Sequence, residues 1–186
     1  MELFLVSGNR HKFGEISGIL KKHGISLNWK KMSMLEEPEL SLEETARAKA
    51  GQAFRALGKP LISEDTGVFF EAFNNFPGSQ AKRVWEEIGF EGLLKKIEGK
   101  SRRARFETLI CFTRDGREFR VFRGVLRGTI DTKVNNPEKD VLPYEKIFIP
   151  DGMECTVSAL PRSEKNRFSH RAKAAEKLAE WLIEKN

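Results

Sequence analysis

The sequence predicts an α/β fold built on a mixed sheet, in a single domain that spans residues 1–186. Its first 30 residues read as a strand, a helix and a second strand, an order that gives parallel strands. Residues 103–131 read instead as antiparallel strands joined by a hairpin turn at Asp115-Gly116. Both kinds of pairing in one chain of this length indicate a mixed sheet flanked by helices.

The N-terminal elements follow from local patterns. Residues 2–7 form an apolar run that is typical of a buried central strand and ends in the turn signal Ser7-Gly8-Asn9. Apolar residues at helical spacing predict a helix over 11–22, which Gly24 terminates. A second strand is expected over 25–30.

The next helix has clear signals at both ends. Ser41 and Glu44 fit a capping box that opens a helix over 42–57, and Gly58-Lys59-Pro60 closes it. The apolar strand that begins at residue 61 is expected to end at Glu64-Asp65. After a turn-rich loop, a helix is expected over 84–98.

The C-terminal half alternates between strands and irregular segments. Strands are expected over 103–113, 118–123 and 124–131, and a short buried strand over 147–150. Residues 132–146 between them are polar and irregular. The last helix is expected over 168–184, because its apolar residues share one face.

Composition excludes several classes of protein. With 39% hydrophobic and 32% charged residues, the chain is neither collagen-like, nor disordered, nor a disulfide scaffold. We expect no signal peptide and no membrane contact, because no apolar run approaches the length of a span. Cys111 and Cys155 lack metal-ligand spacing, which favours reduced thiols in a cytoplasmic protein. The net charge of +6 suits nucleic acid or nucleotide phosphates, although many of these charges belong to a solvated helix face.

The segment from Ser7 to Lys12 joins a buried strand to a helix start. Backbone amides at a helix N-terminus bind anions, Gly8 permits close approach, and Lys12 adds a positive charge. The alternative is that Asn9 only caps the helix while Lys12 is solvated. Local chemistry leaves the two interpretations open.

The second constellation is acidic. Glu64-Asp65 follows an apolar strand, where open α/β sheets place active groups, and alternation along the strand lets only one of the two face a given side. Carboxylates from two segments can hold Mg²⁺, and the glutamate-rich segment 36–44 could supply the second. The alternative for these glutamates is a solvated first turn in which Glu44 completes the cap.

The third constellation is basic and opens the last helix. Lys165 and Arg171 could read acceptor oxygens on a base or bind phosphate, while a lone His170 is more often structural. Position alone does not decide between these roles.

Taken together, these segments resemble the inosine/xanthosine triphosphate pyrophosphatase family, and the match covers nearly the whole chain in the family's order. The matching motifs are Ser7-x-Asn9-x-x-Lys12-x-x-Glu15, Glu37-Pro38 with Lys49 further on, Glu64-Asp65-Thr66-Gly67, Phe76-Pro77-Gly78, Phe148-Ile149-Pro150 and Glu164-Lys165-Asn166-x-x-Ser169-His170-Arg171. Each motif is weak alone, but the ordered set is specific.

The resemblance implies an Mg²⁺-dependent enzyme that hydrolyses non-standard purine nucleoside triphosphates (ITP, dITP and XTP) to monophosphate and pyrophosphate. It implies an elongated, two-lobed shape with a cleft between the lobes, a homodimer, and no need for nucleic acid as a partner.

The resemblance also implies roles for single residues. Glu37 and Asp65 would bind Mg²⁺, and Asp65 would orient or deprotonate the attacking water, with Lys12 and Lys49 as the catalytic lysines. The residues implied along the triphosphate are Ser7, Gly8, Asn9, Lys12, Lys49 and Thr66. The residues implied near the base are Tyr144, Lys165, Ser169, His170 and Arg171.

One segment departs from the family pattern. Where the family has Gly-Phe-Gly-Tyr-Asp-Pro, residues 141–146 lack both glycines, Leu142 replaces the aromatic residue, and Glu145 replaces the aspartate. The hydrolytic half of the site is therefore complete and the base-reading half altered. Two alternatives stay open: hydrolysis of another modified nucleotide, or a non-catalytic module that binds nucleotides or nucleic acid.

Overall fold

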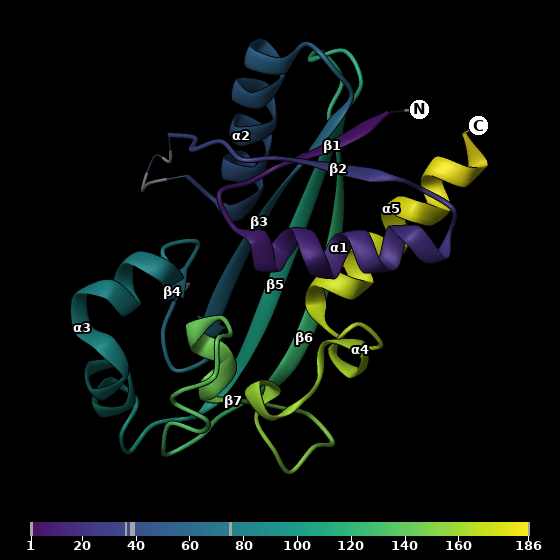
Figure 1. Cartoon of the computed structure of the whole chain (residues 1–186). Coiled ribbons are helices and arrows are strands. Elements are labelled where there is room, and N and C mark those ends of the chain that lie inside the picture. Colours follow the sequence, from purple (N-terminus) through teal and green to yellow (C-terminus); the bar gives the residue numbers. More distant parts are fainter. Residues whose placement is uncertain (1, 36, 38–39, 75, 186) are drawn as a thin grey trace.

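The computed structural model describes residues 2–35, 37, 40–74 and 76–185, and shows a mixed sheet with helices on both faces (Figure 1). The sheet order is β2-β1-β3-β5-β6-β7, with β4 paired to β3. The strands are β1 (Leu3–Val6), β2 (Leu27–Lys30), β3 (Leu61–Phe70), β4 (Pro77–Gly78), β5 (Arg103–Thr113), β6 (Arg120–Ile130) and β7 (Phe148–Pro150). Strand β1 pairs in parallel with β2 and β3, and the other pairs are antiparallel, so the predicted mixed sheet is confirmed.

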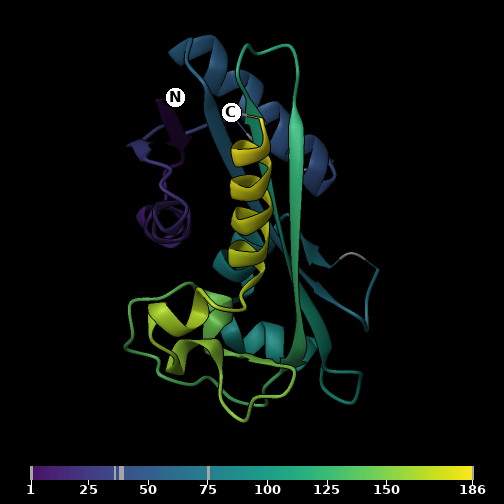
Figure 2. The same ribbon diagram turned by 90° about the vertical axis from the view of Figure 1, so that its right-hand side faces the viewer.

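Three of the helices, α1 (Arg10–Lys22), α2 (Leu42–Leu57) and α5 (His170–Glu184), cover the two faces of the sheet. The other helices are α3 (Ala81–Lys96) and α4 (Arg162–Lys165), with 3-10 turns at Pro143–Lys146 and Val157–Ala159. Helices α1 and α5 pack on one face of the sheet, and α2 packs on the other (Figures 1 and 2). A third core cluster joins α3, β7 and the 3-10 turns at the far end of β3, β5 and β6 (Figure 1). The molecule is elongated because elements gather at both ends of these long strands.

The helix ends agree with the local signals. Asn9 caps α1 by accepting from the backbone N–H of His11, and the capping box of Ser41 and Glu44 opens α2. Gly58, in the left-handed region at φ 63°, closes α2.

Several predicted boundaries were wrong. Strand β3 does not end at Glu64-Asp65 but runs ten residues to Phe70, because β5 pairs with it along its whole length. The two strands expected over 118–131 are one strand, and α3 starts earlier than expected and is broken at Gly89. The short elements β4 and α4 had no sequence signal, and α5 begins at His170.

No helix within the described ranges is both long and apolar enough to cross a membrane. Cys111 is buried, Cys155 is exposed, and both are free thiols, as expected.

The start of α5 packs closely on β6, and Gly124 permits this contact. A Cβ at Gly124 would lie 1.9 Å from the carbonyl oxygen of His170 and 2.6 Å from the backbone nitrogen of Ala174. Both atoms belong to the helix backbone, which cannot move without displacing the residues that α5 carries.

We therefore predict that Gly124→Ala lowers the free energy of unfolding by about 1–3 kcal/mol or more, as overpacking does. The matched control is Gly51→Ala in α2, where a Cβ meets side-chain atoms no closer than 3.7 Å. In that helix interior, alanine should be neutral or add up to about 1 kcal/mol. Denaturant melts of both variants measure the difference, and equal stabilities would contradict the packing argument.

Candidate active site

An unpaired stretch of β3 organises the candidate site. Strand β1 pairs with β3 only as far as Ile62, and β4 pairs with it only from Val68. Between these positions, no strand in the described part of the chain covers this edge of β3. On this edge the Phe4 N–H donates to the Pro60 carbonyl, and the Phe70 N–H donates to the Phe76 carbonyl. Residues 60 and 70 thus direct backbone groups to this edge, and because the direction alternates along a strand, the other even-numbered residues of β3 do the same. The peptide groups of Glu64 and Thr66 therefore face the open edge.

Two lysine–carboxylate pairs flank this edge, one on each face of the sheet. On the face of α1 and α5, Lys12 Nζ lies 2.6 Å from Glu64 Oε2. On the face of α2, Lys49 Nζ lies 2.6 Å from Asp65 Oδ1. All four groups are largely buried, and Lys12 is not the solvated side chain that one interpretation expected.

The loop after β1 leads to the same edge. Ser7 and Asn9 are tied by a hydrogen bond from the Asn9 N–H to Ser7 Oγ, and Asn9 Oδ1 caps α1. Gly8 separates them and is exposed. The structure thus bears out the capping role of Asn9 and also brings Lys12 to the carboxylate of Glu64.

Arg171 links the Glu64 pair to a larger buried charge network. Its Nε donates to Glu64 Oε1 at 2.9 Å, and its terminal nitrogen donates to Glu15 Oε2 at 2.6 Å. Lys165 lies 3.4 Å from the other oxygen of Glu15 and 2.9 Å from Glu145. Charges of alternating sign therefore run from Lys12 to Glu145 through the interior.

The network shifts the pKa values of its acids in different directions. Burial opposes the charged form of Glu64, but Lys12 and Arg171 together hold the pKa of this carboxyl well below its usual range. For Glu145, burial outweighs the charge of Lys165 and raises the pKa. Glu64 is thus the most firmly ionised acid of the site.

Asp65 has a different environment. Burial raises its pKa despite the neighbouring charge of Lys49. Its Oδ2 is buried and has no hydrogen-bond partner among the residues that the structure describes. A buried carboxylate oxygen without a partner is costly, which marks it as a candidate ligand atom.

The residues around Asp65 fit Mg²⁺, which binds proteins through one or two carboxylates and takes its other ligands from water and substrate phosphates. No group of three or more His, Cys, Asp or Glu in the described ranges could hold a metal by itself. Glu37 is exposed in the loop before α2, and Glu36 and Glu39 lie outside the described residues. The metal pair of Glu37 and Asp65 stays a prediction.

The predicted base-side residues are buried and mostly committed to partners. Ser169 Oγ caps α5, and Arg171 is fully buried between two glutamates. His170 stacks on Phe106 with ring centroids 4.6 Å apart, and burial lowers its pKa well below the usual value, so it is neutral. The ring of Tyr144 packs in the core, and its hydroxyl donates to the carbonyl of Ala81.

Three acids and a threonine of this region were not predicted as site residues. Glu15 lies one helical turn after Lys12, so the spacing of the first motif was a usable signal. Glu64 was placed beside Asp65 without a role of its own, and Glu145 only as a replaced residue. Thr108 had no signal, because β5 also contains Arg103, Arg105, Glu107 and Thr113, and no pattern distinguishes Thr108 from these polar residues.

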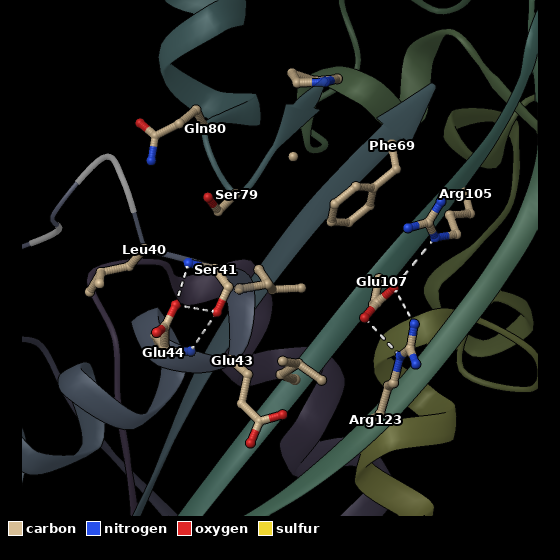
Figure 3. A pocket seen from close by; sticks show the side chains of 14 residues that line it. Leu40, Ser41, Glu43, Glu44, Phe69, Ser79, Gln80, Arg105, Glu107 and Arg123 are labelled. Carbon is tan, nitrogen blue, oxygen red and sulfur yellow. Dashed lines mark hydrogen bonds and ion pairs between the residues drawn. The ribbon is translucent and has the colours of Figure 1, made fainter. Parts of the chain in front are cut away.

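A hollow of about 640 Å³ lies on the α2 side of the sheet (Figure 3). Arg105 and Arg123 pair there with Glu107, and the capping box of α2 forms the opposite wall (Figure 3). Its lining includes none of the predicted site residues. Glu107 neutralises both arginines in part, and Phe69 of β3 and Pro77 and Gly78 of β4 also line the hollow.

Known proteins are similar to this chain in both sequence and fold. A sequence model of the Ham1 family matches residues 3–181. The chain is 38% identical over 181 residues to a protein of Hyperthermus butylicus named dITP/XTP pyrophosphatase, with 97% of this chain and 94% of that protein covered. A Methanopyrus kandleri protein of the same name is 37% identical over 182 residues, with 97% and 96% covered.

Solved structures agree. The Ham1 protein of Staphylococcus aureus matches with a TM-score of 0.81 at 25% identity, over 100% of both chains. The HAM1 protein of Coxiella burnetii matches with a TM-score of 0.83 at 24% identity, over 99% of this chain and 100% of that one, which supports the fold. These matches confirm the resemblance carried by the motifs, and the chain belongs to the Ham1 family.

Proposed function

We propose that the protein is an Mg²⁺-dependent pyrophosphohydrolase that converts dITP, ITP and XTP to monophosphate and pyrophosphate. The names of the relatives support this substrate class. The observation that carries the proposal is the pair of lysine–carboxylate contacts, Lys12–Glu64 and Lys49–Asp65, on the two sides of one open strand edge. A phosphate chain laid along this edge meets a lysine on each side.

The chain's own groups can hold a triphosphate there. The N-terminus of α1 and the loop of Ser7, Gly8 and Asn9 offer backbone N–H groups to an anion. The Thr66 N–H faces the open edge, and Lys12 and Lys49 add positive charge. Phosphoryl transfer needs this combination of positioning and charge neutralisation.

Asp65 is the group that acts on water in this proposal. Its Oδ2, which no described residue hydrogen-bonds, would accept a hydrogen bond from the attacking water, while Lys49 holds Oδ1 and fixes the direction of the carboxylate. Mg²⁺, held by Asp65 and Glu37 together with the phosphates, would neutralise charge on the phosphate oxygens.

The base side rests on fewer groups. Lys165 and Arg171 would lie near the base, and buried ion pairs with Glu15 and Glu145 would hold their side chains in place. Leu142 offers no aromatic face, and the Tyr144 ring is turned into the core. These two observations favour a second candidate, the same hydrolysis on another modified nucleotide. Homodimer formation and a cytoplasmic location also stay predictions.

The first test is a substrate panel. Purified protein with Mg²⁺ should release pyrophosphate from dITP, ITP and XTP far faster than from ATP or GTP, and mass spectrometry should identify the monophosphate. Chelation of divalent ions should stop the reaction. Absence of turnover on all five nucleotides would overturn the assignment, and preference for a different modified nucleotide would support the second candidate.

The second test addresses Asp65. Asp65→Asn should lower kcat by roughly 100-fold or more, the usual contribution of a positioned acid or base. The amide keeps the shape and still accepts from Lys49, but it removes the negative charge beside this buried lysine, so the melting temperature should fall. Activity is therefore compared at a temperature at which thermal melts show both proteins folded.

Asp151→Asn is the matched control, since Asp151 forms an exposed ion pair with Arg103 outside the site. This control should retain full activity. An Asp65→Asn protein that turns over at the wild-type rate would remove Asp65 from the mechanism.

A further inference from the structure

Thr108 is a buried polar residue beside the site that neither the motifs nor the relatives' names assign a role. It lies on β5 directly opposite Thr66, and it is fully buried. Its hydroxyl oxygen is 2.5 Å from Thr66 Oγ1 and 3.4 Å from Glu64 Oε1.

Thr108 interrupts an apolar row. Side chains two apart on β5 share a face, and the buried neighbours of Thr108 on that face are Phe106, Ile110 and Phe112. A valine would fit this position in shape and would leave no hydroxyl to satisfy. The Thr108 hydroxyl lies where the side chains of Glu64 and Thr66 on the neighbouring strand β3 contact it.

The direction of each hydrogen bond follows from a count of donors. Glu64 Oε1 accepts from Arg171 Nε at 2.9 Å, and Oε2 faces Lys12 Nζ at 2.6 Å, so this carboxylate is an acceptor. Thr66 must therefore donate its single hydroxyl hydrogen to Glu64 Oε1, 2.5 Å away. In the 2.5 Å contact between the two threonines the donor is then Thr108, whose other acceptor, Glu64 Oε1, is farther away at 3.4 Å. Arg171 donates to the same Thr66 oxygen at 3.4 Å. A directed chain of hydrogen bonds therefore runs from Thr108 through Thr66 to Glu64.

This chain has two consequences for the site. The Thr66 hydroxyl has no hydrogen left for a phosphate, so its contribution to the phosphate path must come from its backbone N–H. In addition, the chain fixes Oε1 of Glu64, and the second oxygen of this carboxylate then points at Lys12.

We propose that Thr108 is a positioning residue for phosphate binding: it orients Thr66, Thr66 orients the carboxylate of Glu64, and Glu64 holds Lys12 at the open edge of β3. The inference rests on the proposed function only in placing the phosphate chain at that edge. The inference assigns a role to Thr108. It also assigns the Thr66 side chain to positioning Glu64, so that only the Thr66 backbone N–H is left to contact phosphate.

The test is a double-mutant cycle with the isosteric variants Thr66→Val and Thr108→Val, and Thr108→Ser as the conservative control. Titration calorimetry with inorganic triphosphate and Mg²⁺ measures binding without requiring turnover. Loss of one relay hydrogen bond should raise Kd roughly three- to tenfold in each single variant. The double variant should be no weaker than the singles, because both substitutions break the same chain.

Thr108→Ser should keep the wild-type Kd, and thermal melts should show that all four variants fold. With dITP, the same variants should raise KM more than they lower kcat.

Additive losses, or a loss confined to Thr66→Val, would mean that the Thr66 hydroxyl binds phosphate directly, and would overturn the proposal. So would an unchanged Kd in Thr108→Val, with or without a lower melting temperature, and so would failure of the wild type to bind inorganic triphosphate. If the binding pattern holds while no nucleotide is hydrolysed, the proposed function fails and the role of Thr108 stands.

Discussion

The buried negative charge of Glu64 is the feature on which the rest of the site depends. Its carboxylate contacts Lys12 of α1, Arg171 of α5 and Thr66 of β3, and so connects three elements that are distant in sequence. An unpaired carboxylate in the interior would be strongly unfavourable, so folding must bring these partners together. The requirement to neutralise one charge thus places the first lysine of the site and anchors the helix that carries Arg171.

In the proposed function two adjacent carboxylates serve one ligand, and the open edge of β3 is what would allow this. Side chains of neighbouring strand residues point to opposite faces, which suggested that only Glu64 or Asp65 would face a site. At an unpaired edge, however, both faces border the same space. Lys12 approaches from the side of α1 and Lys49 from the side of α2, and the strand lies between them.

Local patterns predicted the fold well where the determinants are close in sequence, and failed where they are distant. The cap of α2 needs only Ser41 and Glu44, three residues apart, and it was predicted correctly. The end of β3 was misplaced because polar residues in a strand read as a terminus. Only pairing with β5 and ion pairs to Lys12 and Lys49 make Glu64 and Asp65 acceptable inside it. For the same reason the motifs picked out Lys12, Lys49 and Asp65, which the structure brings to one strand edge. They did not predict the contacts of Glu15 or Thr108, whose partners lie up to 156 residues away.

The formal charges of the buried network bear on the need for a cation. Lys12, Arg171 and Lys165 are matched by Glu15, Glu64 and Glu145, and Lys49 is matched by Asp65. A triphosphate therefore meets lysines whose charge is already compensated by buried acids. The attraction of the two lysines is thus partly offset, and backbone N–H groups at the open edge and at the start of α1, with a divalent cation that arrives with the phosphates, would supply the rest. In the proposed function, dependence on Mg²⁺ would follow from these paired charges as much as from the chemistry of hydrolysis.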